Sequence, residues 1–205
     1  MGSKDRRARI KQTTRQGILA GARQIAQEEG WSALTIRKVA EHIEYSPSIV
    51  YEYFDSKEDI LRALLQEGFQ MLTTAMAQAQ ASTADPTERV LRLGDAYWQF
   101  AHANPDLYQV MHGLAGVTVS GEARAQAVQE VCRITEQSLI DWADAQGMRL
   151  ADPYAATEVI WALLHGLISL RLADRLTGDE EHTRRQLRDA GQALLRGWAL
   201  PTPGA

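Results

Sequence analysis

Apolar residues recur at intervals of three and four along almost the whole chain, which is the spacing of one face of an α-helix. No convincing run alternates between apolar and polar residues, as a half-buried strand would. Pro86, Pro105 and Pro153 each stand where a helix is expected to begin, because proline is tolerated in a first helical turn. The sequence therefore predicts an all-α protein.

The predicted helices form two groups. Three short ones cover residues 14–29, 36–43 and 47 to 53 or 54, with Thr35 and Ser46 as N-caps and a tight break at Glu44 and Tyr45. This layout is that of a helix-turn-helix. Longer helices are expected over residues 57–82, 86–104, 105–114, 122–146, 153–177 and 179–198. We expect a helix-turn-helix domain over residues 1–57 and a helical effector-binding and dimerisation bundle over residues 58–205.

The charge is distributed unevenly along the chain. The net charge of −4 argues against a nucleic-acid partner, but seven basic residues and one acidic residue fall within residues 1–25. This end is either a DNA-contacting surface or a solvated tail. In the first case, residues 4–11 track the phosphate backbone or enter the minor groove.

Several classes of site and location are not expected. The N-terminus lacks a secretory signal, and the apolar run over residues 159–170 is too short and too closely flanked by charge to cross a bilayer, which takes ~20 residues. The single cysteine, Cys132, excludes an intrachain disulfide and is expected to be a buried apolar residue. Three histidines in the bundle lack the spacing of metal ligands. We expect a cytoplasmic protein with no metal, no cofactor and no membrane partner.

Residues 35–60 read TIRKVAEHIEYSPSIVYEYFDSKEDI, and this segment resembles the DNA-binding signature of the TetR family of bacterial regulators. The resemblance rests on Thr35, the apolar positions of the second helix, and the elements Ser46, Val50–Tyr51, Tyr53–Phe54, Ser56–Lys57 and Ile60. The chain departs from the family at Glu44, where glycine is usual because the turn favours a positive φ.

The chemistry of this segment suits DNA. Val50 and Phe54 are expected to face inward, Ser48 can bind a base or a phosphate, and Ile49 can contact a thymine methyl group. Tyrosines, a threonine and a lysine are placed to hold phosphates, although the tyrosines could equally be core residues. The predicted DNA-binding residues are Thr35, Arg37, Ser46, Pro47, Ser48, Ile49, Tyr51, Tyr53 and Lys57.

The resemblance also implies a C-terminal domain that binds a small effector and dimerises. Asn104, Pro105, Tyr108, Met111 and Gly113, followed by Trp161, His165 and Gly166, are similar to a TetR subfamily with a Trp-His-Gly signature. Aromatic residues and histidines cluster in the same region, either around an effector pocket or as ordinary core residues. The predicted pocket residues are Trp98, His102, Tyr108, Met111, His112, Trp142, Trp161 and His165.

Two helices are candidates for a dimer interface. Residues 159–170 are apolar on nearly every face, which requires burial on two sides. The last helix carries an apolar face with small residues, and four helices, two from each subunit, are expected to form the interface. The predicted interface residues are Leu187, Ala190, Gly191, Leu194 and Trp198.

These features predict a ligand-responsive transcriptional regulator, most simply a repressor released from double-stranded operator DNA by a small, largely apolar effector. The long helix from residue 57, with Gly68, Met71 and Met76, is the expected lever between effector and DNA. Two other classes stay open: a small-molecule binding protein or enzyme with a vestigial DNA domain, and a helical adaptor. No nucleophile–base pair, phosphate loop or carboxylate dyad supports an enzyme, so no catalytic residue is predicted.

Overall fold

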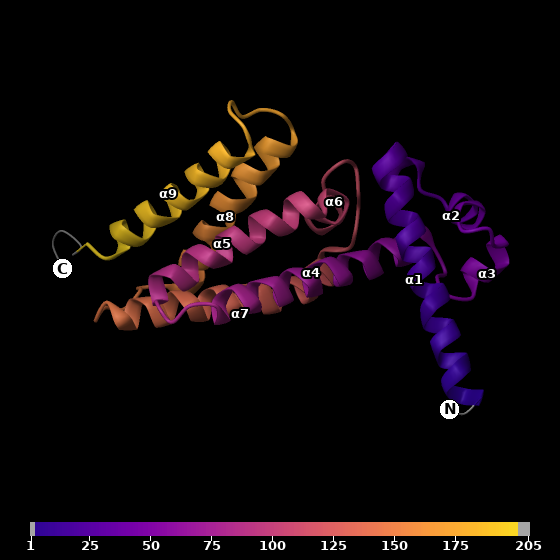
Figure 1. Ribbon diagram of the computed structural model, residues 1–205, viewed down its shortest axis with the longest axis horizontal. Helices are drawn as coiled ribbons and strands as arrows, with labels where there is room; N and C mark the ends of the chain where they lie inside the picture. The colour runs from indigo at the N-terminus through magenta and orange to yellow at the C-terminus, as the bar shows by residue number, and fades with distance from the viewer. Residues whose placement is uncertain (1–2, 201–205) are drawn as a thin grey trace. The chain divides into compact units, whose positions relative to one another are not determined.

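The computed structural model describes residues 3–200, and this part of the chain contains helices and no strand, as predicted. Figure 1 shows the course of the chain. In order, the elements are α1 (Ser3–Glu29), the 3₁₀ helix η1 (Trp31–Ala33), α2 (Ile36–His42), α3 (Pro47–Tyr51), α4 (Lys57–Ala81), α5 (Pro86–Ala103), α6 (Pro105–His112), α7 (Gly121–Ala145), α8 (Pro153–Leu172) and α9 (Glu180–Trp198).

Aspartate caps fix the starts of three long helices. Asp85 accepts hydrogen bonds from the backbone amides of Thr87 and Glu88 at 2.8 and 3.1 Å, and Pro86 follows it. The carboxylates at positions 152 and 179 cap α8 and α9 in the same way. A carboxylate here satisfies amides that lack a partner within the helix, and it also interacts favourably with the helix dipole.

The chain divides into two compact units. The first comprises the described residues up to Gly68 together with Asp106–Ala127, so it includes α1–α3, the first part of α4, α6 and the start of α7. Within this unit α1 packs against η1 and α2, and α2 packs against α3. Its core contains Ile18, Val39 and Leu64, each with no exposed surface.

The second unit comprises Phe69–Pro105 and the described residues from Val128 onward. Helices α5, α8 and α9 pack against one another, and Figure 1 shows α9 (yellow) alongside α5 and α8. The core is apolar and includes Tyr97, Leu139, Trp142 and Ile168, all at most 2% exposed.

Several helix ends differ from the prediction, and three of them matter here. α1 begins at Ser3 and not near residue 14, so the basic N-terminal stretch is helical. α3 ends at Tyr51, two or three residues early. α8 ends at Leu172, before the predicted end near residue 177, because Asp174 adopts a left-handed φ of 53° and the Arg175 amide donates back to the Leu170 carbonyl at 2.9 Å.

Candidate DNA-binding and effector-binding sites

The turn between α2 and α3 has the geometry that the motif predicts. Thr35 caps α2, because its hydroxyl accepts a hydrogen bond from the Lys38 amide at 3.1 Å. α2 ends at His42, and in the turn that follows Glu44 has a φ of 58°, in the left-handed region, while the Tyr45 amide donates back to the Ala40 carbonyl at 2.9 Å. Glu44 therefore holds the position that usually favours glycine.

The recognition helix α3 separates its buried and exposed sides as expected. Val50 and Phe54 are buried, with 0% and 4% of their surface exposed. Tyr51 is 54% exposed, so its ring is not part of the core, whereas Tyr53 is half-buried. The rest of the exposed or half-buried side consists of Pro47, Ser48 and Ile49. This side is free to enter a DNA groove.

The start of α3 differs from the prediction in one detail. Ser46 precedes the helix, but its side chain does not cap it, because the Ser46 and Ser48 hydroxyls bond each other at 2.8 Å. Tyr45 lies next to them and is 50% exposed. The sequence assigned Tyr45 only to the break between helices, yet an exposed phenol beside α3 is a further candidate for DNA contact. The signal available in the sequence was the position of this tyrosine, directly before the start of α3.

Lys57 has a structural partner as well as its predicted role. Its Nζ donates to the Trp31 carbonyl at 2.9 Å, which ties the start of α4 to η1. An ammonium group has three donors, so two remain for a phosphate. Arg37 is exposed on the first turn of α2. The DNA roles of both residues stay predictions.

A nearly buried ion pair fastens α1 to α6 within the first unit. Arg23 Nε and Nη2 donate to the two carboxylate oxygens of Asp106 at 2.5 and 3.2 Å. The Asp106 side chain is 3% exposed and that of Arg23 is 22% exposed. The two residues are 83 positions apart in the chain, and the sequence did not predict that they form an ion pair. The bidentate geometry fixes the orientation of the two helices.

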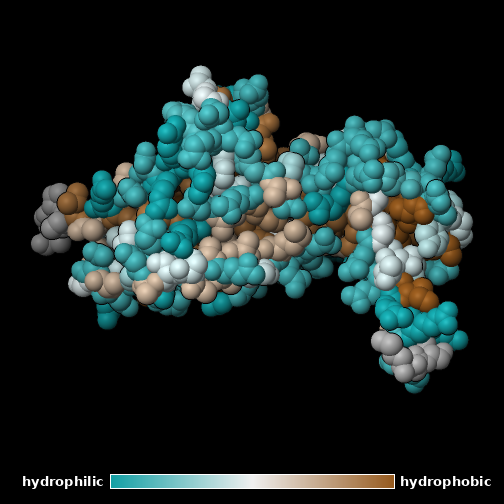
Figure 2. Space-filling model, viewed as in Figure 1, coloured by the Kyte–Doolittle hydropathy of each residue, from teal (hydrophilic) through white to brown (hydrophobic). Residues whose placement is uncertain are grey.

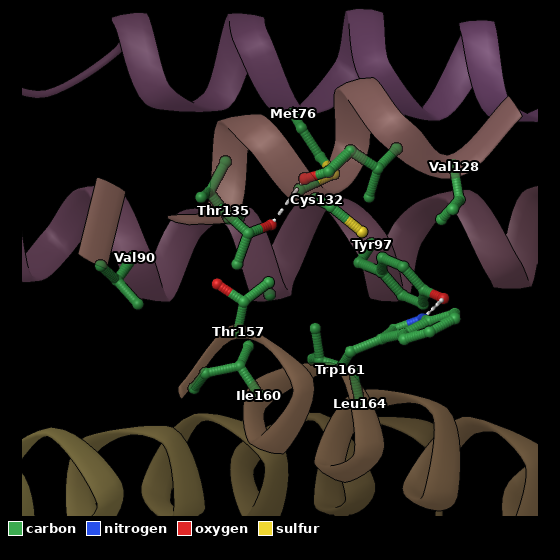
Figure 3. Close-up of a pocket in the computed structure, with 13 residues that line it drawn as sticks. Met76, Val90, Tyr97, Val128, Cys132, Thr135, Thr157, Ile160, Trp161 and Leu164 are labelled. Carbon is green, nitrogen blue, oxygen red and sulfur yellow. Dashed lines mark hydrogen bonds between the residues drawn. The ribbon is translucent and has the colours of Figure 1, made fainter. Parts of the chain in front are cut away.

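The second unit contains a partly enclosed, mainly apolar cavity (Figure 3). Three helices supply almost all of its wall, and the free space left between the side chains is about 20 Å³. That is room for roughly one water molecule. The lining residues are Met76 of α4, Val90, Leu93, Gly94 and Tyr97 of α5, Val128, Val131, Cys132 and Thr135 of α7, and Thr157, Ile160, Trp161 and Leu164 of α8.

Few polar atoms reach this cavity. The indole Nε1 of Trp161 donates to the Tyr97 hydroxyl at 3.0 Å, and Figure 3 shows this pair at one end. The Thr135 and Thr157 hydroxyls each donate to a carbonyl of their own helix at 2.9 Å, which leaves their oxygen lone pairs available. Burial raises the pKa of the Cys132 thiol, and nearby glutamates raise it further. The thiol is therefore protonated at neutral pH.

The structure does not bring the predicted effector residues together. Of the eight, Trp161 alone lines the cavity. Tyr108, Met111 and His112 belong to the first unit, where the Tyr108 and His112 rings lie 4.3 Å apart. The rest lie elsewhere in the second unit and do not line the cavity: Trp98, His102, Trp142 and His165. The sequence shows which residues are aromatic, but helical spacing alone could not give the direction in which each ring points.

The four predicted effector residues of the second unit that do not line the cavity have partners elsewhere in that unit. The centroids of the Trp98 and His102 rings lie 4.1 Å apart along α5, with the rings tilted by 32°, and His102 Nε2 lies 3.6 Å from a Glu180 carboxylate oxygen. Trp142 is buried against the end of α9. His165 lies within 3.5 Å of the Ser169 hydroxyl, and burial lowers the pKa of its imidazole. Over residues 3–200 no three potential metal ligands gather.

Part of the predicted dimer interface is used inside the subunit. Leu187 is 4% exposed and packs on α5, where a Cβ added to Gly94 would lie 3.3 Å from its Cδ2. Gly191 likewise faces Leu91 of α5. These contacts use part of the apolar side of α9 to cover α5, and the role of either residue in a dimer interface stays a prediction. The remaining three are half-buried: Ala190, Leu194 and Trp198.

Helix α8 carries most of the large apolar side chains that are exposed in the described part of the second unit. It leaves Tyr154, Val159 and Leu170 at 57%, 44% and 41% exposed. With 20 residues, α8 is long and apolar enough to cross a membrane by length and composition alone. The predicted apolar run, residues 159–170, is only part of this helix, and a core helix of a soluble protein meets the same criterion, so the match is weak evidence.

Two family models and several known proteins match this chain. Residues 90–194 match the family described as Tetracyclin repressor-like, C-terminal domain, and residues 18–64 match Bacterial regulatory proteins, tetR family. The uncharacterized HTH-type transcriptional regulator Rv0681 of Mycobacterium tuberculosis is 27% identical over 171 residues, which cover 80% of this chain and 73% of that protein.

Solved structures share the fold. A protein of unknown function from Rhodococcus sp. RHA1 superposes with a TM-score of 0.78 at 23% identity, covering 91% of this chain and 95% of the other. The fatty acid degradation regulator FadR from Bacillus halodurans superposes with a TM-score of 0.73 at 19% identity, covering 89% and 95%. The matched families and relatives are regulators and not enzymes. The chain belongs to the TetR family of DNA-binding transcriptional regulators.

Proposed function

We propose that this regulator is a homodimeric, cytoplasmic repressor that leaves its operator when a small, largely apolar effector enters the cavity of the second unit. The observation that carries this proposal is the cavity itself, enclosed by α5, α7 and α8 and lined by apolar side chains with four polar groups. Small-molecule sites in proteins have this composition.

The DNA-contacting part of the proposal centres on α3. Residues 1–57 are the DNA-binding domain and residues 58–205 bind the effector and the partner. Ser48 and Ile49 contact bases, and Tyr51 and Lys57 contact phosphates. Thr35, Arg37, Ser46, Pro47 and Tyr53 complete the contact set.

Selection of genomic DNA fragments by the purified protein tests this function. A repressor of this kind should enrich a palindromic sequence whose half-sites are one helical turn or a multiple of it apart. Lys57→Ala should weaken binding to all sequences and lower the slope of log affinity against log salt by about one. Ile49→Ala should instead change preference at one base-pair step. Enrichment of no sequence would refute the proposal.

The cavity limits the chemistry of the effector. Its free volume of about 20 Å³ means that an effector must displace side chains, so a small molecule is favoured. The walls favour an apolar body, and the Tyr97–Trp161 pair and the Thr135 and Thr157 hydroxyls can match one or two polar groups. Trp161 is the predicted pocket residue that keeps this role.

Two buried threonines provide a matched test of the cavity. Thr157 lines it, whereas Thr183 does not, and each hydroxyl bonds a carbonyl four residues back in the chain. Operator release should be screened with short fatty acids, phenols and aromatic amines. Thr157→Val should raise the concentration of the active compound needed for release roughly fivefold, the effect of about one lost hydrogen bond. Thr183→Val should leave it unchanged, and equal effects would exclude the cavity.

One side of α8 offers a structural explanation for the subfamily resemblance. Ala155, Val159, Ala162 and Gly166 follow one another at intervals of four, three and four, which places them along one side of the helix. All four are exposed or half-buried, and nothing lies within 4 Å of a Cβ added to Gly166. We propose that Trp161, His165 and Gly166 mark the Trp-His-Gly subfamily, with Gly166 in the dimer interface.

Sedimentation tests this interface. Ala162→Glu places an unpaired charge where two subunits should meet, which costs several kcal/mol. The variant should be monomeric at micromolar concentration and remain folded. Gly191→Glu should instead destabilise the subunit itself, because Gly191 faces α5. A folded dimeric Ala162→Glu protein would show that the interface lies elsewhere.

A further inference from the structure

We propose that the basic half of α1, residues 4–15, is a helix that binds the phosphates of duplex DNA beside the sequence contacted by α3. This inference extends the proposed DNA contact beyond the helix-turn-helix. α1 is continuous from Ser3 to Glu29, so the segment is not an extended arm. Figure 2 shows the N-terminal end of α1 as a mostly hydrophilic projection.

The basic half of α1 is exposed to solvent over most of its length. Every residue from Lys4 to Thr13 is exposed, and the single large apolar side chain there, Ile10, is 53% exposed. Five of these ten residues are lysine or arginine and one, Asp5, is acidic. Positive charge at a helix N-terminus opposes the helix dipole, and like charges three or four residues apart repel. A polyanion removes both penalties.

The charges are sorted by side. Four basic residues, hereafter the inner stripe, follow at intervals of three, four and four, which places them on one side of the helix. That side continues into Ile18 and Ala22, both completely buried in the first unit. The inner stripe therefore prolongs the face of α1 that packs on the helix-turn-helix. Its members are Lys4, Arg7, Lys11 and Arg15.

Contacts along α1 show where this face leads. At Gly21 a Cβ would lie 2.7 Å from Ile43, at the end of α2. Toward the N-terminus, the guanidinium carbon of Arg15 lies 5.1 Å from the centroid of the Phe54 ring, just beyond α3. The inner stripe thus begins at the C-terminal end of the recognition helix and runs away from it. We infer that these charges face the phosphates of a duplex that is docked on α3.

The length of the inner stripe sets its reach. The eleven-residue interval from Lys4 to Arg15 rises about 16 Å in an α-helix, which corresponds to about five base pairs of duplex. Lysine and arginine on phosphates fix position without reading bases. The stripe should therefore lengthen the DNA footprint on each flank and leave the sequence preference unchanged. A membrane surface is not favoured, since an interfacial helix needs a broad apolar face that residues 4–13 lack.

A charge-matched pair of variants tests this assignment. Arg7→Gln/Lys11→Gln removes two charges from the inner stripe, and Arg6→Gln/Arg9→Gln removes two from the opposite side of the same helix. Each protein is titrated with a mixed-sequence 30-base-pair duplex, with the selected operator core, and with that core extended by seven base pairs on each side. Hydrogen exchange of the amides of residues 5–13 is measured with and without the extended duplex.

The inner variant should lose about tenfold in affinity for the extended duplex and about 1.8 in salt slope per subunit, because each phosphate contact contributes about 0.9. Its affinity for the bare core should equal that of the native chain. The outer variant should change less than twofold, and the extended duplex should slow exchange in residues 5–13 of the native chain. Equal effects of the two variants, or an effect of the inner variant on anionic vesicles and not on DNA, would overturn the proposal. Failure to select any operator would refute the proposed function, while the mixed-sequence titration would still decide the role of the stripe.

Discussion

The Arg23–Asp106 pair should respond unequally to loss of its two partners. Removing Arg23 leaves a carboxylate that is 3% exposed without its counter-ion, and breaking a buried pair in this way costs about 3–5 kcal/mol. Removing Asp106 leaves a guanidinium with 22% of its side chain already in solvent, so it can turn outward. That loss should be nearer 1–3 kcal/mol, the cost of an unmet buried donor.

Thermal unfolding measures this difference. For a chain of this size, 1 kcal/mol shifts Tm by about 2–4 °C, so Arg23→Ala should lower Tm by roughly 10 °C and Asp106→Ala by about half as much. Arg23→Met/Asp106→Leu should recover most of the loss, because an apolar pair of similar volume often replaces a buried ion pair without penalty.

An exposed pair provides the control. Arg133 and Glu130 also form an arginine–carboxylate pair, but their side chains are 64% and 50% exposed. Arg133→Ala should leave Tm within experimental error, as is usual for surface pairs. Equal losses for the two single variants of the buried pair, or a larger loss for Asp106→Ala, would refute the reasoning from exposure.

Three further outcomes follow from the structure. Gly68→Ala should lower Tm by a few degrees, because the new Cβ would lie 2.7 Å from the buried Met111 sulfur. This crowding should outweigh the gain in helix propensity. Gly17→Ala is the control and should not lower Tm, because nothing lies within 4 Å of its new Cβ. Burial lowers the pKa of His165, so the folded state binds fewer protons than the unfolded one and stability should fall as pH drops below about 6.5; His165→Gln should flatten this dependence in a Tm–pH series. Cys132, whose thiol pKa is raised, should react with iodoacetamide at pH 8 more slowly than glutathione, and more slowly still with effector bound; a rate equal to that of glutathione would place the thiol outside the cavity.

Local signals in the sequence were enough to predict most helix starts and the helix-turn-helix. Pro86 and Pro153 begin helices as expected, and Val50 and Phe54 are buried, because proline geometry and helical spacing act over a few residues. The N-terminal part of α1 was missed for the same reason. It lacks the apolar periodicity that identifies an amphipathic helix, and Ile10 is the only large apolar residue among its polar ones.

Contacts between distant positions could not be predicted in this way. In the sequence Asp106 looks like an ordinary acidic residue in a first helical turn, because its arginine partner lies 83 positions away. Gly68 resembled a point of flexibility in a lever helix, but the structure shows that it allows α6 to approach α4 closely at Met111. Most of the predicted effector residues do not line this cavity, because a cavity depends on which side of each helix faces its neighbours. Threonines and a cysteine, which stood out less than tryptophan, line it.

The two faces of α8 join the proposed effector site to the proposed dimer interface. Ile160 and Leu164 line the cavity, whereas Val159 and Ala162 lie on the opposite side of the same helix. Because the cavity holds only about 20 Å³ of free space, an effector must push its walls apart, and a helix moves as a rigid rod. Displacement of α8 on the cavity side therefore shifts the surface that faces the partner by a similar distance. Recognition helices in a dimer must fit successive major grooves about 34 Å apart, so a shift of this kind lowers affinity for the operator. The loss of operator-binding free energy is limited to the difference in effector-binding free energy between the two arrangements, typically 1–3 kcal/mol.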